Sequence, residues 1–288
     1  MKMIHDILQY RNYVCSRIFE SLGVLMLLYE LMSIVTPVEN LTLCHKLMIF
    51  ISIVFVSLFY AICGLLWPKK ELTLNINKRT HFVIKQGDIM KENGMRIIPV
   101  NEYFDTHLGD GIINENSLHG KFLQSHVEKI PKLRQMIDEQ LASLTPLPEN
   151  RKRKMLPGLP NKRYPLGSCV RIEDGSSCYL LVAVTRFNKY EHVEVSTEEF
   201  PEIIRKLFNG IEQLHDGRPV YLPLIGSGIS GYELTNMQIL YIIVQAAHLA
   251  NNLSITNGLH LYVYGDEQMK SINLNVIKYL FSRWTTLK

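Results

Sequence analysis

Residues 221–234 read YLPLIGSGISGYEL and place glycines in a G-x-G-x-x-G pattern at Gly226, Gly228 and Gly231. A strand-like run, RPVYLPL, precedes them, and a helix-like run that starts at Thr235 follows. A strand, a glycine turn and a helix in this order direct backbone N–H groups at one point, which suits an anion such as a phosphate. Glycine also permits a close backbone approach and a positive φ angle. We therefore predict a phosphate-binding loop here.

The surrounding sequence argues against three familiar phosphate-binding motifs. A dinucleotide-binding turn needs an acidic residue about 20 residues later, at the end of the next strand. Here the next strand reaches an acidic residue only at Asp266, and the motif lies late in its domain instead of opening it. No Lys-Ser/Thr pair follows the glycines, which excludes a Walker A loop. No D-F-G sequence follows either, which argues against a kinase.

Strands and helices alternate along the chain from about Glu71 onward. The strand-like segments are ELTLNI, THFVIKQGDI, MRIIPVNEYFD, RPVYLPL and GLHLYVYG, together with the hairpin SCVRIEDGSSCYLLVAVTRF, which turns at Asp174-Gly175. The helix-like segments are SLHGKFLQSHVEKI, PKLRQMIDEQLASL, STEEFPEIIRKLFNGIEQL, TNMQILYIIVQAAHLANN and DEQMKSINLNVIKYLFSRW. Ser196 with Glu199 and Thr235 with Gln238 are expected to form capping boxes. This alternation predicts an α/β domain over residues 71–288 with a mostly parallel sheet.

Two apolar runs precede this domain. Residues 47–67 carry no charge, and a helix of roughly 20 such residues spans a bilayer. Residues 18–36 are nearly as apolar but contain Glu20 and Glu30. We predict a transmembrane hairpin after an N-terminal segment of residues 1–17. The alternative is a buried core helix, although such helices seldom lack a polar face.

The basic residues predict the orientation of this hairpin. They lie before the first run and after the second, whereas the connection between the runs contains only Lys46; the flanking residues are Lys2, Arg11, Arg17, Lys69, Lys70, Lys78 and Arg79. The positive-inside rule then places both termini in the cytoplasm of the cell that makes the protein. The five cysteines form no C-x-x-C pair, which agrees with a reducing compartment.

Charge and histidine spacing point away from nucleic-acid binding and from metal binding. The net charge is only +4, and the dense basic patch RKRK at residues 151–154 reads as a solvated loop or as a contact with anionic lipid headgroups. The ten histidines form no metal-ligand spacing. We predict no catalytic residue, no metal site and no nucleic-acid partner.

Two further motifs lie upstream of the glycine loop. The sequence VIKQGDI occupies residues 83–89, and RIIPVN occupies residues 96–101. Together with the glycine loop, these motifs resemble those of macrodomains, the ADP-ribose-binding modules, over roughly residues 71–288. The resemblance implies a three-layer α/β/α fold with a mixed, mostly parallel sheet, and a ligand derived from ADP-ribose with no other cofactor.

The resemblance also implies roles for individual residues. Asp88 matches the carboxylate that accepts a hydrogen bond from the adenine amino group, Ile89 its neighbour in the adenine pocket, and Asn101 the asparagine near the distal ribose. The phosphate-binding loop comprises Gly226, Ser227, Gly228, Ile229, Ser230 and Gly231, followed by Tyr232 near the ribose or diphosphate; Gly109, Asp110 and Gly111 remain from a second glycine loop. Alternatively, Asp88 is a turn residue, Asn101 caps a strand end, and residues 226–231 form a plain turn.

The sequence departs from hydrolytic macrodomains near the distal ribose. The stretch NEYFDTHLGDGIINENSLHG replaces a longer glycine run, and Ile98 replaces the first asparagine of an N-x-x-N pair. These departures argue against ADP-ribosyl hydrolysis. They indicate either an ordinary solvated loop or a distal pocket whose polar side chains read a group attached to ADP-ribose; the candidates are Glu102, Asp105, His107 and Asp110.

Two transmembrane helices followed by a divergent macrodomain resemble the membrane effector of type II Thoeris antiphage systems. That resemblance implies a TIR-domain partner that makes a signal from NAD, an ADP-ribose conjugated to an amino acid such as histidine. The effector binds the signal, forms a homo-oligomer and disrupts the inner membrane of the infected bacterium, which gives abortive infection. The alternatives are a membrane-anchored ADP-ribosyl hydrolase and a tethered ADP-ribose-binding module without toxic output.

Glu20 and Glu30 fit such an assembly. Carboxylates inside a membrane are costly and usually face a partner helix or water. Because we expect no basic partner for them within one hairpin, we predict that they contribute to assembly in the membrane. The alternative is that Glu20 is interfacial and that Glu30 is protonated or reaches the interface.

Overall fold

The computed structural model describes residues 7–35, 41–108, 112–148, 159–187, 192–228, 232–250 and 252–282. These residues fall into two compact units. One lies within Met1–Lys70 and Asn273–Lys288, and we call it the helical unit; the other lies within Glu71–Ile272, and we call it the sheet unit. Each is described by itself.

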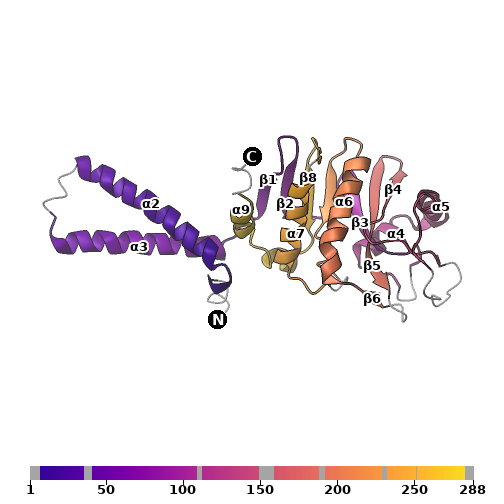
Figure 1. The fold of residues 1–288 in the computed structure, drawn as a ribbon, viewed down its shortest axis with the longest axis horizontal. Helices are drawn as coiled ribbons and strands as arrows, with labels where there is room; N and C mark the ends of the chain where they lie inside the picture. The colour runs from indigo at the N-terminus through magenta and orange to yellow at the C-terminus, as the bar shows by residue number, and fades with distance from the viewer. Residues whose placement is uncertain are drawn as a thin grey trace. The chain divides into compact units, whose positions relative to one another are not determined.

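The sheet unit is built on a mixed β-sheet in which the strand order is β1-β2-β8-β7-β3-β5-β4 (Figure 1). The five neighbours β2, β8, β7, β3 and β5 run parallel, and β1, β4 and β6 pair antiparallel with their partners. The strands are β1 (Glu71–Asn75), β2 (His81–Gln86), β3 (Met95–Asn101), β4 (Cys169–Asp174), β5 (Ser177–Phe187), β6 (Val193–Glu194), β7 (Val220–Pro223) and β8 (Leu259–Val263). This arrangement confirms the predicted mixed, mostly parallel sheet.

Helices cover both faces of this sheet. Its α-helices are α4 (Leu118–Gln124), α5 (Ile130–Leu141), α6 (Phe200–Leu214), α7 (Asn236–Leu249) and α8 (Asp266–Lys270), with short 3-10 turns η2 (Ile89–Lys91), η3 (Val127–Lys129) and η4 (Thr197–Glu199). Helices α6 and α7 pack together in front of the sheet in Figure 1.

Side chains that alternate along β5 establish the three layers. The side chain of Cys169, which pairs with Val182 of β5, approaches Gly210 of α6. Tyr179, an odd number of residues from Val182 on the same strand, contacts Phe122 of α4 instead. Because successive side chains of a strand point to opposite faces, α4 and α6 cover opposite faces, which confirms the predicted α/β/α architecture.

The core is centred on β3 and β5. Both strands are buried along almost their whole length, as expected for parallel strands that are covered on two faces. Their buried side chains are mostly apolar and include Ile97, Ile98, Leu180, Leu181 and Val182, whose branched shapes suit a packed sheet. The carboxyl ends of β2, β3 and β7 therefore emerge at one edge of a rigid sheet.

The two predicted capping boxes have different outcomes. At α7, the Thr235 hydroxyl accepts from the Gln238 backbone N–H, and the Gln238 side chain accepts from the Thr235 backbone N–H, which confirms the prediction. The prediction at Ser196 was wrong, because its side chain makes no capping bond. Glu199 instead accepts a hydrogen bond of 2.7 Å from Arg186, and α6 begins after a 3-10 turn.

The helical unit contains α2 (Arg11–Val35), α3 (Leu43–Leu66) and α9 (Leu274–Ser282). Helices α2 and α3 have 25 and 24 residues, and their most apolar windows have mean hydropathies of 1.8 and 2.6. By length and composition, both can cross a membrane. These windows are 0% and 11% buried, which differs from the core helix of a soluble domain. The predicted spans of residues 18–36 and 47–67 coincide with these helices, except that Thr36 lies outside the described residues.

One of the two carboxylates on the predicted first span has a basic partner, contrary to expectation. Glu20 accepts a hydrogen bond of 2.7 Å from Arg17, one helical turn earlier. The same guanidinium donates to the Tyr60 hydroxyl of α3 and lies 4.8 Å from the centre of its ring. Arg17 precedes the predicted span, but α2 begins at Arg11, so Arg17 lies on the same helix as Glu20 and within reach of it. Glu30 is exposed on α2.

Helix α9 caps the end of α3 within the helical unit. The Asn273 amide donates to the Leu65 carbonyl at 3.1 Å. The Asn275 amide donates to the carbonyls of Gly64 and Trp67 at 2.8 and 3.3 Å. The last carbonyls of a helix lack partners within the helix, so these side chains complete α3. Helix α9, which the sequence assigned to a domain of residues 71–288, therefore groups with α2 and α3.

The capping result gives a matched pair of variants for stability. We expect Thr235→Ala to remove a capping bond and to cost about 1 kcal/mol, which corresponds to roughly 2–4 °C in melting temperature for a domain of this size. Ser196→Ala should change the melting temperature by much less, because Ser196 makes no capping bond. Thermal unfolding of the full chain in detergent micelles compares the two, and equal shifts would contradict the assignment.

Candidate functional site

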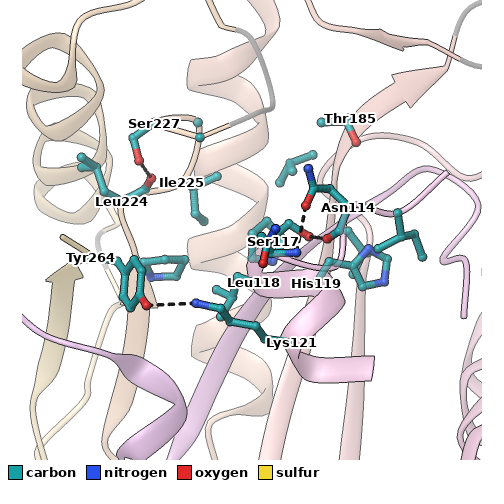
Figure 2. A pocket seen from close by; sticks show the side chains of 18 of the residues that line it. Asn114, Ser117, Leu118, His119, Lys121, Thr185, Leu224, Ile225, Ser227 and Tyr264 are labelled. Carbon is teal, nitrogen blue, oxygen red and sulfur yellow. Dashed lines mark hydrogen bonds between the residues drawn. The ribbon is translucent and has the colours of Figure 1, made fainter. Parts of the chain in front are cut away.

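A cavity of about 610 Å³ lies at the carboxyl ends of the parallel strands (Figure 2). Its lining includes three segments that the sequence singled out: Asp88 with Ile89 after β2, Asn101 at the end of β3, and residues 226–228 after β7. This is the edge of an open α/β sheet at which ligands usually bind. The volume suits a ligand of nucleotide size. The fold thus brings the three motifs together.

Asp88 stands at the start of the short turn η2. The preceding Gly87 donates its N–H to the Val263 carbonyl at 3.1 Å, and a Cβ atom at Gly87 would lie 2.5 Å from the Tyr262 ring, so only glycine fits there. One carboxylate oxygen of Asp88 accepts from the Met90 N–H at 3.0 Å. Asp88 is therefore a turn residue and a lining residue at once, and Ile89 is buried beside it.

The Asn101 side chain is committed to its own loop. Its amide nitrogen donates to the Asp105 carboxylate at 3.0 Å, and its oxygen accepts from the N–H groups of Tyr103 and Asp105 at 3.0 and 3.4 Å. The turn that it closes includes Phe104 at a φ of 53°. Asn101 lines the cavity, but its polar atoms brace the chain after β3.

The acidic residues of this loop are placed differently from expectation. Asp105 and Glu102 are each 1% exposed and lie outside the cavity lining. Glu102 accepts from the Phe187 N–H at 3.2 Å, which ties the loop to β5. His107 is exposed and also lies outside the lining. Gly109, Asp110 and Gly111 fall outside the described residues, so the structure brings none of the predicted appendage readers into the described cavity.

The glycine loop lines the cavity through residues 226–228. Gly226 has a φ of +92°, which favours glycine, and a Cβ atom there would lie 3.2 Å from the rings of Phe200 and Tyr232. At Gly228 no heavy atom lies within 4 Å of an added Cβ, so the space beside it is open. The Ser227 hydroxyl donates to the Leu224 carbonyl at 2.6 Å and stabilises the turn. Ile229, Ser230 and Gly231 lie outside the described residues.

Tyr232 supports this loop from the protein interior and does not line the cavity. Its hydroxyl donates to the Val184 carbonyl at 2.6 Å, and its ring packs against that of Phe200 with 4.8 Å between the ring centres. Burial raises the pKa of this phenol above its ordinary value. A buried tyrosine hydroxyl needs a hydrogen-bond partner, and the Val184 carbonyl of β5 supplies it. A position of Tyr232 near the ribose or diphosphate stays a prediction.

One wall of the cavity comes from residues that the sequence analysis left as an ordinary helix. Asn114, Asn116, Ser117, His119 and Lys121 line it from α4 and the turn before it. A Cβ atom at Gly120 would clash with the Asn114 carbonyl oxygen, so a glycine is needed for α4 to pack against the turn that precedes it. Ser117 caps α4 by accepting a hydrogen bond from the Gly120 N–H, and this serine is the local sequence signal for where the helix begins.

His119 is a buried, neutral member of this wall. Its Nε2 lies 3.0 Å from the Asp105 carbonyl, which fixes the ring. Burial lowers the pKa of His119 to about 4, and the nearby Asp105 only partly offsets this. The imidazole is therefore uncharged at neutral pH.

Lys121 meets Tyr264 beside the cavity. Its ammonium lies 3.1 Å from the Tyr264 hydroxyl and 4.2 Å from the centre of that ring (Figure 2). The two residues are 143 positions apart in the chain. No sequence motif linked them.

Comparison with known families identifies the domain. The family model described as "Thoeris protein ThsA, Macro domain" matches residues 82–264. The chain belongs to this family. The matched region contains Asp88, Asn101 and the glycine loop, and it stops before α9. The predicted relationship to Thoeris proteins and the predicted macrodomain fold are both confirmed.

A curated ThsA supports the assignment. The "Thoeris protein ThsA" of Bacillus amyloliquefaciens (strain Y2) is 32% identical over 164 residues, which covers 56% of this chain. The match covers 52% of that relative, so the chain spans about half of its length. The shared part is thus a ThsA-type macrodomain.

Solved structures agree at the level of the fold. A macrodomain variant from Oceanobacillus iheyensis determined with ADPR has a TM-score of 0.51 and 17% identity, and the match covers 74% of this chain and 99% of that one. The macrodomain of the same organism with MES bound has a TM-score of 0.50 and 17% identity, over 74% and 98% of the two chains. Similarity at this level establishes the shared fold of the ThsA macrodomain.

The depressed pKa of His119 predicts a loss of stability in mild acid. A histidine whose pKa is about 4 when folded and 6.5 when unfolded stabilises the fold fully above pH 6.5, and this contribution is lost as the pH falls towards 4 because the unfolded chain binds the extra proton. Between pH about 7.5 and about 5 the expected loss is roughly 2 kcal/mol.

The variant His119→Gln should flatten this pH dependence, because glutamine keeps a donor but does not titrate. Melting temperatures of the full chain at the two pH values measure the effect. His81→Gln, at an exposed position of β2, is the matched control and should retain the wild-type slope. A wild-type slope in His119→Gln as well would show that His119 does not set it.

Proposed function

We propose that this protein is a ligand-gated antiphage effector of the bacterial inner membrane, whose cytoplasmic macrodomain senses an ADP-ribose derivative. The observation that carries the proposal is the cavity at the ends of β2, β3 and β7, in a ThsA macrodomain that follows two membrane-length helices. A TIR-domain partner supplies the signal, an amino-acid conjugate such as histidine-linked ADP-ribose. The bound effector oligomerises and disrupts the membrane, which causes abortive infection.

The cavity supports an ADP-ribose ligand. Asp88 and the buried Ile89 form the end that accepts adenine, and residues 226–228 form an open turn for the diphosphate. The solved macrodomain of similar fold that holds ADPR points in the same direction. Asn101 and Thr185 lie at the ends of β3 and β5, where the distal ribose and its appendage would lie.

The membrane helices support an effector with both termini in the cytoplasm. Basic residues flank the hairpin on the sides of residues 1–17 and 68–79, which favours this orientation. Because Arg17 neutralises Glu20, Glu30 is the carboxylate that gains most from a second copy of the hairpin. A ligand drives assembly only if it binds the assembling state more tightly than the resting state.

A short stretch of chain offers a route from the cavity to the membrane helices. Gln268, which lines the cavity, donates to the Ser227 carbonyl at 3.3 Å. The Ser271 hydroxyl accepts a hydrogen bond of 2.7 Å from the side-chain amide of Asn236, the first residue of α7, which follows the glycine loop. Two residues later, Asn273 begins the cap on α3. We infer that movement of the glycine loop reaches the end of α3 along residues 268–275.

Calorimetry on the full chain in lipid nanodiscs tests the ligand. We expect ADP-ribose to bind and the histidine conjugate to bind more tightly. Gly228→Glu should abolish binding, because a carboxylate in the open space at residue 228 repels the diphosphate. Gly228→Gln, whose side chain has the same shape as that of glutamate but no charge, should retain most of the binding.

Asp88→Asn keeps a side-chain oxygen that can accept from the Met90 N–H but removes the carboxylate charge, so it should weaken adenine binding by roughly tenfold.

The same titration separates the alternatives. Slow heat from turnover, with release of free ADP-ribose from the conjugate, would favour the hydrolase. The commitment of the Asn101 amide to Asp105 and two backbone N–H groups argues against that outcome. If neither ligand binds the wild-type chain, the sensor proposal fails.

The coupling route predicts a variant that binds ligand but fails to respond. Asn273→Ala combined with Asn275→Ala should still bind the ligand, with an affinity lowered by no more than the coupling that is lost, and should reduce ligand-triggered dye release from liposomes by about fivefold or more. Asn257→Ala is the matched control, since the Asn257 amide also donates to a backbone carbonyl but within the sheet unit. Full release by the double variant would contradict the route. Binding without release by the wild-type chain would favour the tethered module.

A further inference from the structure

The cavity must neutralise a ligand that carries negative charge, and the described lining contains few charges to do so. Asp88 is acidic, and His119 is neutral because burial lowers its pKa to about 4. Among the described lining residues, Lys121 is the one lysine or arginine. Backbone N–H groups at a glycine turn supply only partial charges, so a full positive charge at the cavity matters for a phosphate ligand.

The position of Lys121 is fixed by Tyr264. Its ammonium donates to the Tyr264 hydroxyl at 3.1 Å and lies 4.2 Å from the ring centre, which combines a hydrogen bond with a cation–π contact. An ammonium has three donor hydrogens, so this contact leaves donors for an anion. Figure 2 shows the side chain extending from α4 towards Tyr264 and the end of β8.

Tyr264 belongs to a chain segment that is hydrogen-bonded both beside Asp88 and to the glycine loop. The residue before it, Val263, accepts from the N–H of Gly87, which immediately precedes Asp88. Four residues after it, Gln268 donates to the carbonyl of Ser227 in the glycine loop. Tyr264 lines the same cavity, so a nucleotide that runs from Asp88 to the loop would have the Lys121–Tyr264 pair beside it.

We propose that Lys121 is a specificity-determining residue that binds the phosphate next to the adenosine, with Tyr264 holding its ammonium in place. The inference rests on the proposed function, since it assumes that adenine lies at Asp88. It assigns the site a preference for ligands that contain an adenosine 5′-phosphate over uncharged nucleosides. It also predicts that the binding affinity falls as salt is added, because a charge pair near solvent is screened.

The test compares three ligands on the full chain in nanodiscs. Lys121→Met keeps the apolar stem and removes the charge, so ADP-ribose and AMP should bind roughly tenfold more weakly, while adenosine should bind as before. Lys121→Arg should restore most of the loss. The salt dependence of ADP-ribose binding up to about 0.3 M NaCl should be shallower in Lys121→Met than in the wild type.

Matched controls make the outcomes distinct. Lys129→Met removes an exposed lysine that pairs with Asp174 away from the cavity, and it should bind all three ligands like the wild type. Equal loss of adenosine binding in Lys121→Met would mean that the residue only shapes the wall, and no loss with any ligand would remove it from the site; either result overturns the inference while the sensor proposal stands. An effect confined to the histidine conjugate would place Lys121 at the appendage and also overturn it. Absence of ADP-ribose and conjugate binding by the wild type overturns both proposals.

Discussion

The parallel pairing of β3 with β7 on one side and β5 on the other is the constraint on which the site depends. In a parallel sheet the carboxyl ends of neighbouring strands meet at one edge, so segments far apart in the chain converge there. Buried apolar side chains on both faces hold the register, because a slip of one residue would exchange the side chains that face α4 with those that face α6. Asp88, Asn101 and Gly226 line one cavity for this reason.

The polar residues near this edge divide into two groups. Asn101, Glu102 and Asp105 are buried, and buried polar groups must be hydrogen-bonded to be tolerated. Their bonds hold the chain after β3 and leave the described lining with few charged side chains. Asp88 and Lys121 remain at the surface of the cavity. Among the described residues, the acidic Glu102 and Asp105 thus stabilise the loop after β3, whereas the glycine turn lines the cavity.

Polar groups of the helical unit also have hydrogen-bond partners. The Arg17, Glu20 and Tyr60 cluster compensates a carboxylate within one hairpin, which removes the need for a partner copy at that position. Asn275 satisfies carbonyls at the end of α3 that the helix itself cannot satisfy. Asn275 of the final helix thereby satisfies the end of α3 at Gly64, 211 residues earlier in the sequence. Gln268 and Ser271 contact the glycine loop and the start of α7. The same short segment continues into Asn273, which donates to the end of α3.

The sequence by itself determined what depends on neighbouring residues. An uncharged run the length of a bilayer, the alternation of strands and helices, and the Thr235 capping box are local patterns, and the structure has all three. The motifs at residues 83–89, 96–101 and 226–231 predicted the macrodomain fold, and together with the two preceding apolar runs they predicted the Thoeris relationship. Only the tertiary structure decided the partners of individual side chains. Ser196 makes no capping bond, and Glu199 binds Arg186 instead. The Tyr232 side chain points into the interior, where the Val184 carbonyl accepts its hydroxyl hydrogen. Lys121 contacts Tyr264, 143 residues later in the chain. Such pairs form only after the sheet brings distant segments together, and no spacing in the chain encodes them.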